Sequence, residues 1–157
     1  MPDIIRNARV EADDWNESEI LTLAQWKERR ESPPAAGERL AVRLEPGDDP
    51  AELAPGIGRL ALVAINFPRF ADGRGYSCAY LLRTRHGYRG ELRAVGDVGR
   101  DQLFYLKRCG FDAFALAPHR DPHAALASLG DFSARYQGSV DDPLPLFRKR
   151  FAARAAP

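Results

Sequence analysis

The sequence predicts a single α/β domain in which consecutive right-handed β-α units build a mainly parallel sheet. The chain has 157 residues, of which 45% are hydrophobic, and this is enough for one buried core. Short apolar runs alternate with segments of helical pattern, and strands that are joined by helices run parallel. These units fit either an open sheet or part of a (β/α) barrel. A partial barrel would leave sheet edges exposed, and a second copy of the chain could cover them in a homodimer.

The first half of the chain contains two expected strands and two expected helices. Residues 4–10 are a weak strand candidate, and the alternating residues 40–44 are a clearer one. A helix begins at Thr22 with a capping box, T-x-x-Q, and ends before Pro33. A short helix follows Asp49, which precedes a proline at the first helical position.

The second half shows the β-α alternation more clearly. Residues 59–67 are a nearly continuous apolar run, which is typical of a strand covered on both faces. The elements expected after it are a polar loop (68–75), helix 76–86, strand 92–96, helix 101–108, strand 112–116 and a helix that begins at Asp121, breaks at Gly130 and resumes through Tyr136.

We expect one domain over residues 1–137, with its motif-bearing core at 59–121, and a tail over 138–157. The tail combines two prolines with a basic run at 148–150. It is therefore expected to be either an arm between copies or, more simply, disordered.

The composition excludes several classes of protein. No apolar run is long enough to span a membrane and the first ten residues lack a secretory signal, which predicts a cytoplasmic protein. A net charge of +1 gives no reason to expect nucleic acid or an acidic membrane as a partner. Cys78 and Cys109 are expected to pack as small hydrophobic residues. His119 and His123 lack a third ligand, so no metal is expected.

Basic residues are concentrated in residues 69–108. Nine basic residues stand there against four acids, so this segment carries +5 and the remainder −4. Eight of the nine are arginines, whose planar guanidinium binds carboxylate, phosphate or sulfate through two parallel hydrogen bonds. The segment predicts an anion site. The alternative is that its arginines only reflect the composition of the whole chain, which has 20 arginines and three lysines.

Three polar loops, 68–75, 97–100 and 117–121, are expected to meet at the carboxyl edge of the sheet, where open α/β sheets and barrels place ligands. The residues expected to bind a ligand are Arg69, Asp72, Gly73, Arg74, Gly75, Tyr76, Ser77, Arg93, Asp97, Arg100 and Asp101. If the protein is an enzyme, the candidates for proton transfer are Asp72, Asp97 and Asp101.

The turn at residues 72–77 suits an anion at the start of a helix. Free backbone N–H groups favour negative charge there, and the two glycines let the backbone approach it closely. The same geometry fits a tight turn capped by Asp72 or Ser77. The segment also begins like the dinucleotide fingerprint, but Cys78 replaces the third glycine, so a nucleotide site is disfavoured.

The charged residues that follow have two interpretations. Asp97 and Asp101 flank Arg100, so carboxylates and guanidiniums from neighbouring loops are expected to pair at the sheet edge. In the alternative, Asp97 caps a helix and Glu91 and Arg93 form a surface pair.

Several strings link the chain to a known family. They are Asn66-Phe67-Pro68, Asp72-Gly73-Arg74-Gly75-Tyr76-Ser77, Leu81-Leu82-Arg83, Gly90-Glu91-Leu92-Arg93-Ala94-Val95-Gly96-Asp97-Val98, Arg100-Asp101-Gln102 and Arg108-Cys109-Gly110-Phe111-Asp112. On these strings the chain resembles a bacterial family of unknown function over most of its length, to about Gln137. The resemblance implies that the protein belongs to a group labelled as probable oxidoreductases, for which no activity is established. It also implies that its gene lies beside the genes of assimilatory sulfite reductase and other sulfate-assimilation enzymes. Gly99 stands where the family generally has a larger apolar residue, which is expected to loosen the start of the following helix.

Three functional hypotheses follow. The leading one is an accessory protein of assimilatory sulfate and sulfite reduction that holds an oxyanion or an acidic partner at the arginine-rich edge. The second is a small oxidoreductase that uses a bound nucleotide, although no residue pattern identifies a cofactor. The third is a non-catalytic structural partner of sulfite reductase or another sulfate-assimilation enzyme, with Tyr76 and Tyr88 as interface anchors.

Overall fold

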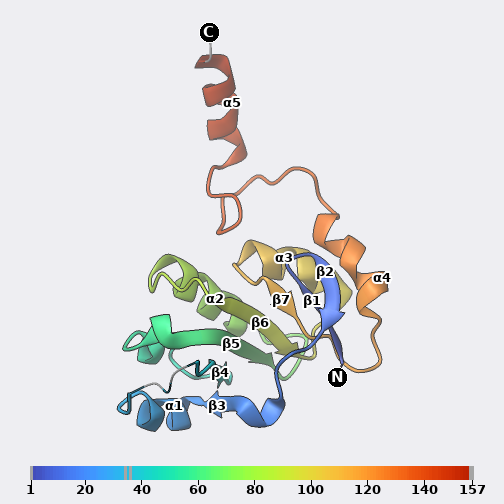
Figure 1. Ribbon diagram of the computed structural model, residues 1–157. Coiled ribbons are helices and arrows are strands. Elements are labelled where there is room, and N and C mark those ends of the chain that lie inside the picture. Colours follow the sequence, from blue (N-terminus) through green and yellow to red (C-terminus); the bar gives the residue numbers. More distant parts are fainter. Residues whose placement is uncertain (1, 34, 36, 156–157) are drawn as a thin grey trace.

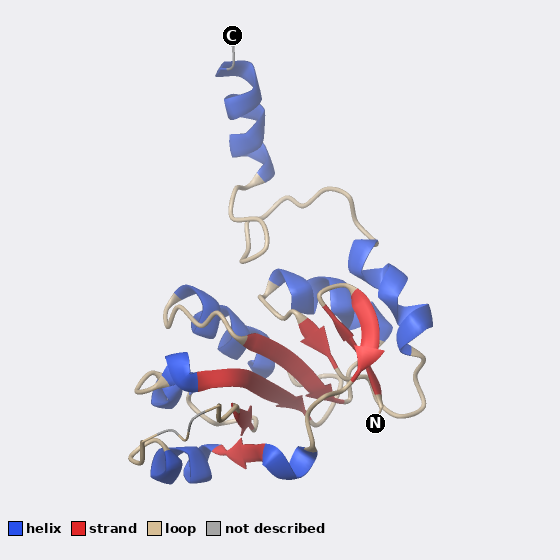
Figure 2. Ribbon diagram, in the orientation of Figure 1, coloured by secondary structure: helices blue, strands red, loops and turns tan. Residues whose placement is uncertain are grey.

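The computed structural model describes residues 2–33, 35 and 37–155, and within them the chain forms an open, seven-stranded sheet (Figures 1 and 2). The strands lie in the order β2-β1-β7-β6-β5-β4-β3. Five of them are parallel: β3 (Ile20–Thr22), β4 (Leu40–Leu44), β5 (Leu60–Phe67), β6 (Glu91–Gly96) and β7 (Ala113–Phe114). The predicted α/β class with a mainly parallel sheet is confirmed, and the sheet is open rather than closed into a barrel.

An antiparallel hairpin occupies the edge of the sheet next to β7. β1 (Asp3–Arg6) and β2 (Arg9–Ala12) replace the single strand predicted for residues 4–10, so that prediction was wrong. The turn residues Asn7 and Ala8 both have a positive φ, 49° and 58°, which is typical of a two-residue hairpin turn. β1 then pairs antiparallel with β7.

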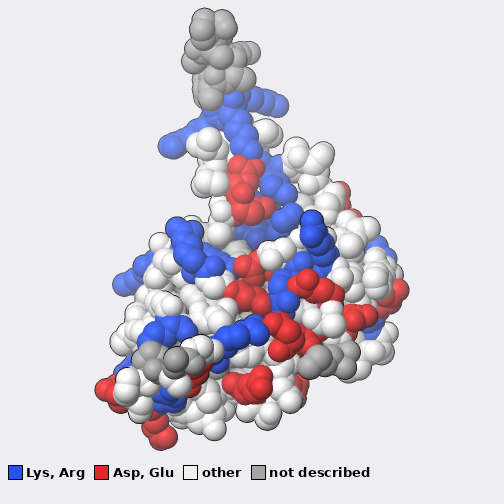
Figure 3. Space-filling view, in the orientation of Figure 1, with Lys and Arg blue, Asp and Glu red and all other residues white. Residues whose placement is uncertain are grey.

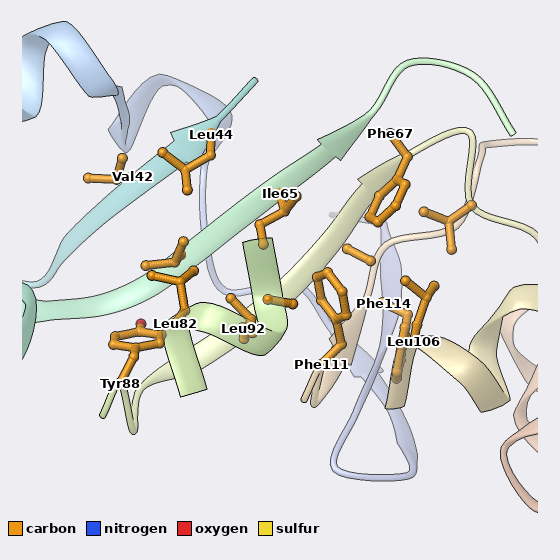
Figure 4. Close-up of a cluster of buried hydrophobic side chains, with 14 of the residues drawn as sticks. Val42, Leu44, Ile65, Phe67, Leu82, Tyr88, Leu92, Leu106, Phe111 and Phe114 are labelled. Carbon is orange, nitrogen blue, oxygen red and sulfur yellow. The ribbon is translucent and has the colours of Figure 1, made fainter. Parts of the chain in front are cut away.

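The helices cover one face of the sheet and enclose the main core. They are α1 (Leu23–Arg29), α2 (Arg74–Thr84), α3 (Leu103–Arg108) and α4 (Pro122–Leu126), with the 3₁₀-helices η2 (Pro50–Leu53), η3 (Ile57–Arg59), η4 (Arg100–Gln102) and η5 (Ala127–Gly130). A further 3₁₀-helix, η1 (Glu17–Glu19), belongs to the segment that crosses the opposite face. Figure 4 shows the buried side chains Val42, Leu44, Ile65, Phe67, Leu82, Tyr88, Leu92, Leu106, Phe111 and Phe114. Removal of this apolar surface from water is the main source of stability.

The opposite face of the sheet is called here the helix-free face, because no α-helix from the described part of the chain lies on it and its one short helical turn is the 3₁₀-helix η1. Segment 13–19 crosses it, and Trp15 packs there against Ala41 and Leu62 in a second, smaller cluster. β5 was expected to be covered on both faces; helices cover one of them, and this segment covers part of the other. Part of this face is therefore left without a covering element, and a groove lies there.

The helix starts predicted at Thr22, Asp49 and Asp121 are confirmed, whereas α2 begins at Arg74, two residues before the predicted start, and α3 begins at Leu103 after η4. Thr22 accepts a hydrogen bond from the backbone N–H of Gln25 and donates its own backbone N–H to the Gln25 side chain, at 3.3 and 2.8 Å. Asp49 caps η2 and Asp121 caps α4 through their carboxylates. β3 was not predicted, because its three residues run directly into the Thr22 cap.

The chain after Gly130 differs from the prediction. The helix expected to resume through Tyr136 was wrong, since no helix lies between η5 and α5 (Leu146–Ala155) in the described residues. Phe132 instead packs edge-on against Phe104 of α3, with ring centroids 4.9 Å apart. This aromatic contact holds the segment against the helical layer without helical backbone.

The tail is anchored to the end of α3 and then leaves the body. The backbone N–H of Val140 and the hydroxyl of Ser139 donate to the carbonyl oxygen of Arg108, at 3.1 and 2.6 Å. α5 then projects away from the sheet (Figure 1). None of the described helices combines the length and the apolar character that crossing a membrane requires.

Candidate functional site

Three loops meet at the carboxyl edge of the sheet, as the sequence predicts. The backbone N–H of Asp97 donates to the carbonyl oxygen of Phe67, at 2.7 Å, and the carboxylate of Asp97 accepts from the backbone N–H of Phe70, at 3.1 Å. Arg120 approaches the other carboxylate oxygen of Asp97 to 3.5 Å. Asp97 therefore ties together the loops that follow β5, β6 and β7, and it does not cap the helix after it.

Gly99 makes room for Arg120. A Cβ atom at position 99 would lie 2.5 Å from the Arg120 guanidinium and 2.5 Å from the Asp101 carboxylate. The expected loosening of the following helix was wrong, because Gln102 accepts the backbone N–H of Gly99 at 2.8 Å and holds the start of η4. The absence of a side chain at position 99 thus admits a guanidinium between the two acidic corners.

The turn at residues 72–77 is occupied by its own ion pair. Arg74 donates through two nitrogens to the two carboxylate oxygens of Asp72, at 3.0 and 2.6 Å, and its backbone N–H donates to the same carboxylate. The hydrogen bonds from Arg74 lower the pKa of Asp72 to about 2. The negative charge favoured at the start of α2 is therefore supplied by the protein itself, and Asp72 is a poor general acid.

The glycine after this pair serves packing rather than phosphate binding. A Cβ atom on Gly75 would lie 2.5 Å from the ring of Phe67, whereas one on Gly73 would meet nothing within 4 Å. The open side of Gly75 is thus filled by a core aromatic ring. In a dinucleotide site that space faces the pyrophosphate, so the packing of Phe67 argues against a dinucleotide site at this turn.

Arg93 lies far from the other predicted ligand-binding residues. Its side chain is 2% exposed on the helix-free face, where it donates to both carboxylate oxygens of Asp13 at 2.9 Å and to Glu91 at 2.7 Å. Arg6 reaches the other oxygen of Glu91 at 2.9 Å. Burial raises the pKa of Glu91, and the two arginines oppose the shift. The predicted Glu91–Arg93 pair exists, but it is buried because segment 13–19 covers it.

Two exposed arginines and two exposed aromatic residues come from neighbouring segments of this edge. The guanidinium groups of Arg69 and Arg100 make no hydrogen bond or ion pair with any residue that the structure describes, and both side chains are exposed. Phe70 and Tyr105 are 52% and 56% exposed. We call these four residues the rim patch.

The rim patch rests on a rigid base. Tyr76 packs between Phe67 and Tyr105, with ring centroids 5.4 and 5.3 Å apart. Gln102 donates to the Phe70 carbonyl oxygen at 3.3 Å and contacts the Tyr76 hydroxyl at 3.3 Å. The patch is thus fixed to the core through two aromatic contacts and one side-chain amide.

The interface anchors suggested from the sequence are only partly accessible. Tyr88 is buried, and its hydroxyl donates to the carbonyl oxygens of Leu60 and Glu91, so its role as an anchor was wrong. Tyr76 is half-buried beneath the exposed Tyr105. The sequence analysis missed the exposed rings of Phe70 and Tyr105, because the exposure of an aromatic residue depends on the fold.

The hollows near this edge do not enclose the rim patch. Arg74 lines a small cavity of about 30 Å³ with Asn66 and Cys78. A larger groove of about 510 Å³ lies on the helix-free face and includes Asn66 and Gly96. The four residues of the rim patch are all exposed, so the patch is an open surface, which suits a large partner better than a small enclosed ligand.

Neither cysteine of the chain has the lowered pKa that marks a reactive thiolate. Burial raises the pKa of Cys78 to about 12 and that of Cys109 to about 11, so both are neutral thiols near pH 7. The described residues also hold no group of three or more histidine, cysteine or acidic side chains arranged for a metal ion.

The fold and the edge define a small α/β domain with an open, arginine-bearing surface at the carboxyl ends of its parallel strands. The chain belongs to a family described as "Bacterial protein of unknown function (DUF934)", whose family model matches residues 41–147. That match runs from β4 to the first turn of α5 and includes the whole edge. No curated protein matches the chain.

Proposed function

We propose that this protein is an accessory protein that docks an acidic protein partner on its rim patch. The observation that carries the proposal is that Arg69 and Arg100, whose guanidinium groups have no partner among the described residues, share one edge of the sheet with the exposed rings of Phe70 and Tyr105. Arginine and aromatic side chains are enriched at protein interfaces and dominate their binding energy.

The rim patch supports a protein partner more than a free oxyanion. The arginine best placed for a small anion, Arg74, already binds the carboxylate of Asp72. Arg69 and Arg100 stand on an open surface, where a single small anion gains little because water competes for it. A protein surface with several carboxylates can engage both arginines while it also covers the two rings.

The resemblance of the chain to its family suggests which partner to test first. The resemblance implies genes beside assimilatory sulfite reductase, and on that ground we propose that enzyme as the partner, in the pathway of sulfate and sulfite reduction. The protein then needs no catalytic group of its own, which agrees with the two neutral thiols and the ion-paired Asp72. A nucleotide retained through purification, or a visible absorption band, would favour the oxidoreductase alternative.

The test is binding of immobilised sulfite reductase by the wild-type chain and two charge-reversed variants. Arg69→Glu/Arg100→Glu is expected to weaken binding by about tenfold or more, with most of the loss at low salt. Arg85→Glu/Arg89→Glu changes the net charge equally at two exposed arginines outside the patch and is expected to bind like the wild type.

An equal loss of binding in both variants would show that net charge alone explains the effect. No binding by the wild type would contradict the proposal. Titration calorimetry with sulfite and sulfate tests the alternative hypothesis that the protein binds a small oxyanion. Binding of either ion that disappears in Arg74→Ala would support an oxyanion site at the turn instead of the rim patch.

A further inference from the structure

A groove on the helix-free face has an apolar floor and an acidic border. It lies at the carboxyl ends of β4, β5 and β6 and has a volume of about 510 Å³. Its lining includes the apolar residues Ile20, Leu23, Ala64 and Val95 and the charged residues Glu17, Arg43, Glu45 and Asp48. Arg43 already pairs with Glu45 at 2.7 Å, so the net charge of the lining is negative.

The C-terminal helix has the opposite character. α5 and its lead-in contain the basic residues 148–150, and Figure 3 shows lysine and arginine side chains gathered where the helix leaves the body. Leu144 and Phe147 are 52% and 48% exposed. Lys149 pairs with Asp142, whereas Arg148 and Arg150 make no ion pair within the described residues. A helix that presents apolar and basic side chains to water in this way lacks a packing partner.

We infer that α5 of one copy of this chain seats in the helix-free groove of a second copy, so that the protein is a reciprocal dimer. Phe147 is the apolar anchor for the floor of the groove, and Arg148 and Arg150 face its acidic border at Glu17 and Asp48. Each copy gives one helix and receives one, which is the closed symmetry expected of a twofold assembly.

A second copy is the occupant because the tether prevents α5 from reaching the groove of its own chain. Residues 139 and 140 are bonded to the end of α3, on the helical face of the sheet. The residues from 141 to 145, between this anchor and the start of α5, span at most about 18 Å when extended. A domain of this length has a diameter on the order of 30 Å, and the groove lies on the other face at the other end of the strands.

The extent of the family supports a role for the start of α5. The family match continues through residue 147, well past the last strand and into the first turn of the helix. A tail without a packing role has no physical reason to share the sequence pattern of the folded domain. The anchor proposed above, Phe147, is the last residue of that match.

The experiment is sedimentation velocity of the full chain with charge-exchange variants. The wild type is expected to form dimers, and Glu17→Lys alone or Arg148→Glu/Arg150→Glu alone should weaken dimerisation by about tenfold or more. A mixture of the two variants should recover a heterodimer, because each reversed helix then meets a groove that carries the new lysine, and each native helix meets a native groove. Arg85→Glu/Arg89→Glu is the matched control and should dimerise like the wild type.

Circular dichroism of each variant confirms that the fold is unchanged. A wild type that sediments as a monomer at every concentration would overturn the inference, as would a dimer that is insensitive to both charge reversals or is not recovered in the mixture. Dimerisation and binding to sulfite reductase are separate measurements on separate residues, so either proposal can fail while the other stands.

Discussion

The two faces of β6 show how one strand can serve two different environments. Leu92 and Ala94 point into the apolar core beneath the helices, whereas Glu91 and Arg93 point into the ion-pair network on the helix-free face. Apolar burial supplies net stability, but the attraction within a buried ion pair is largely offset by the loss of water around its charges. We interpret the helical face as the source of stability and the network as the clamp that holds segment 13–19 in one position.

The largest expected effect belongs to the apolar face. Phe67→Ala removes a ring that contacts Gly75, Tyr76 and Phe111, and we expect the free energy of unfolding to fall by about 3–5 kcal/mol. Urea denaturation followed by circular dichroism measures this loss. A decrease below about 1 kcal/mol would show that the ring is not a central part of the core.

The next effect tests the clamp. Arg93→Ala leaves Asp13 and Glu91 buried without their main cation, and we expect a loss of roughly 3 kcal/mol at pH 7. The exposed pair of Lys27 and Glu52 provides the control, since Lys27→Ala should cost less than about 1 kcal/mol. Equal losses in the two variants would mean that the network is energetically no different from a surface pair.

The same variant has an expected pH dependence. A raised pKa means that the folded state binds the Glu91 proton more tightly than the unfolded state, so this group favours folding at low pH and loses that contribution as pH rises through the folded pKa. Without Arg93 the pKa of Glu91 should rise further. The destabilisation of Arg93→Ala should therefore shrink between pH 7 and pH 5, and a constant difference would contradict this cause.

A smaller effect separates packing from ligand binding at the start of α2. Gly75→Ala should destabilise by about 1–3 kcal/mol because the new Cβ meets the Phe67 ring. Gly73→Ala meets no neighbour and should change stability by less than about 0.5 kcal/mol. Thermal unfolding of the two variants side by side makes the comparison, and equal tolerance at both glycines would remove the packing argument.

The smallest effect concerns the exposed ion pair of the turn. The pKa of Asp72 is lowered to about 2, so its contribution to stability is present above its unfolded pKa of about 3.9 and is lost as pH falls toward 2. Asp72→Asn should lower the melting temperature slightly at pH 7 and match the wild type near pH 2. A difference that persists at pH 2 would show that the carboxylate charge is not its source.

Much of the fold could be predicted because its signals are local. The Thr22 capping box, the caps at Asp49 and Asp121 and the apolar run of β5 each depend on a few adjacent residues, and all are present. β3 could not be found, because three residues are too few to show a period. The hairpin was missed because its turn, Asn7-Ala8, lacks the glycine that usually marks one.

The site was predictable in position but not in detail. Parallel topology alone brings the three loops to one edge, and the contacts of Asp97 confirm that step. Whether an arginine is free or paired depends on distant partners, as with Arg93 and Asp13, which are 80 residues apart. In the same way, only the fold shows that Tyr105 is exposed and that Tyr88 is buried.

The most direct test of the rim patch as the functional surface is hydrogen–deuterium exchange of the protein with and without sulfite reductase. We predict new protection of backbone amides in residues 68–73 and 99–105, with little change in residues 85–90 at the far end of α2. Protection confined to residues outside the rim, or no change in any segment at saturating partner, would contradict docking at this edge.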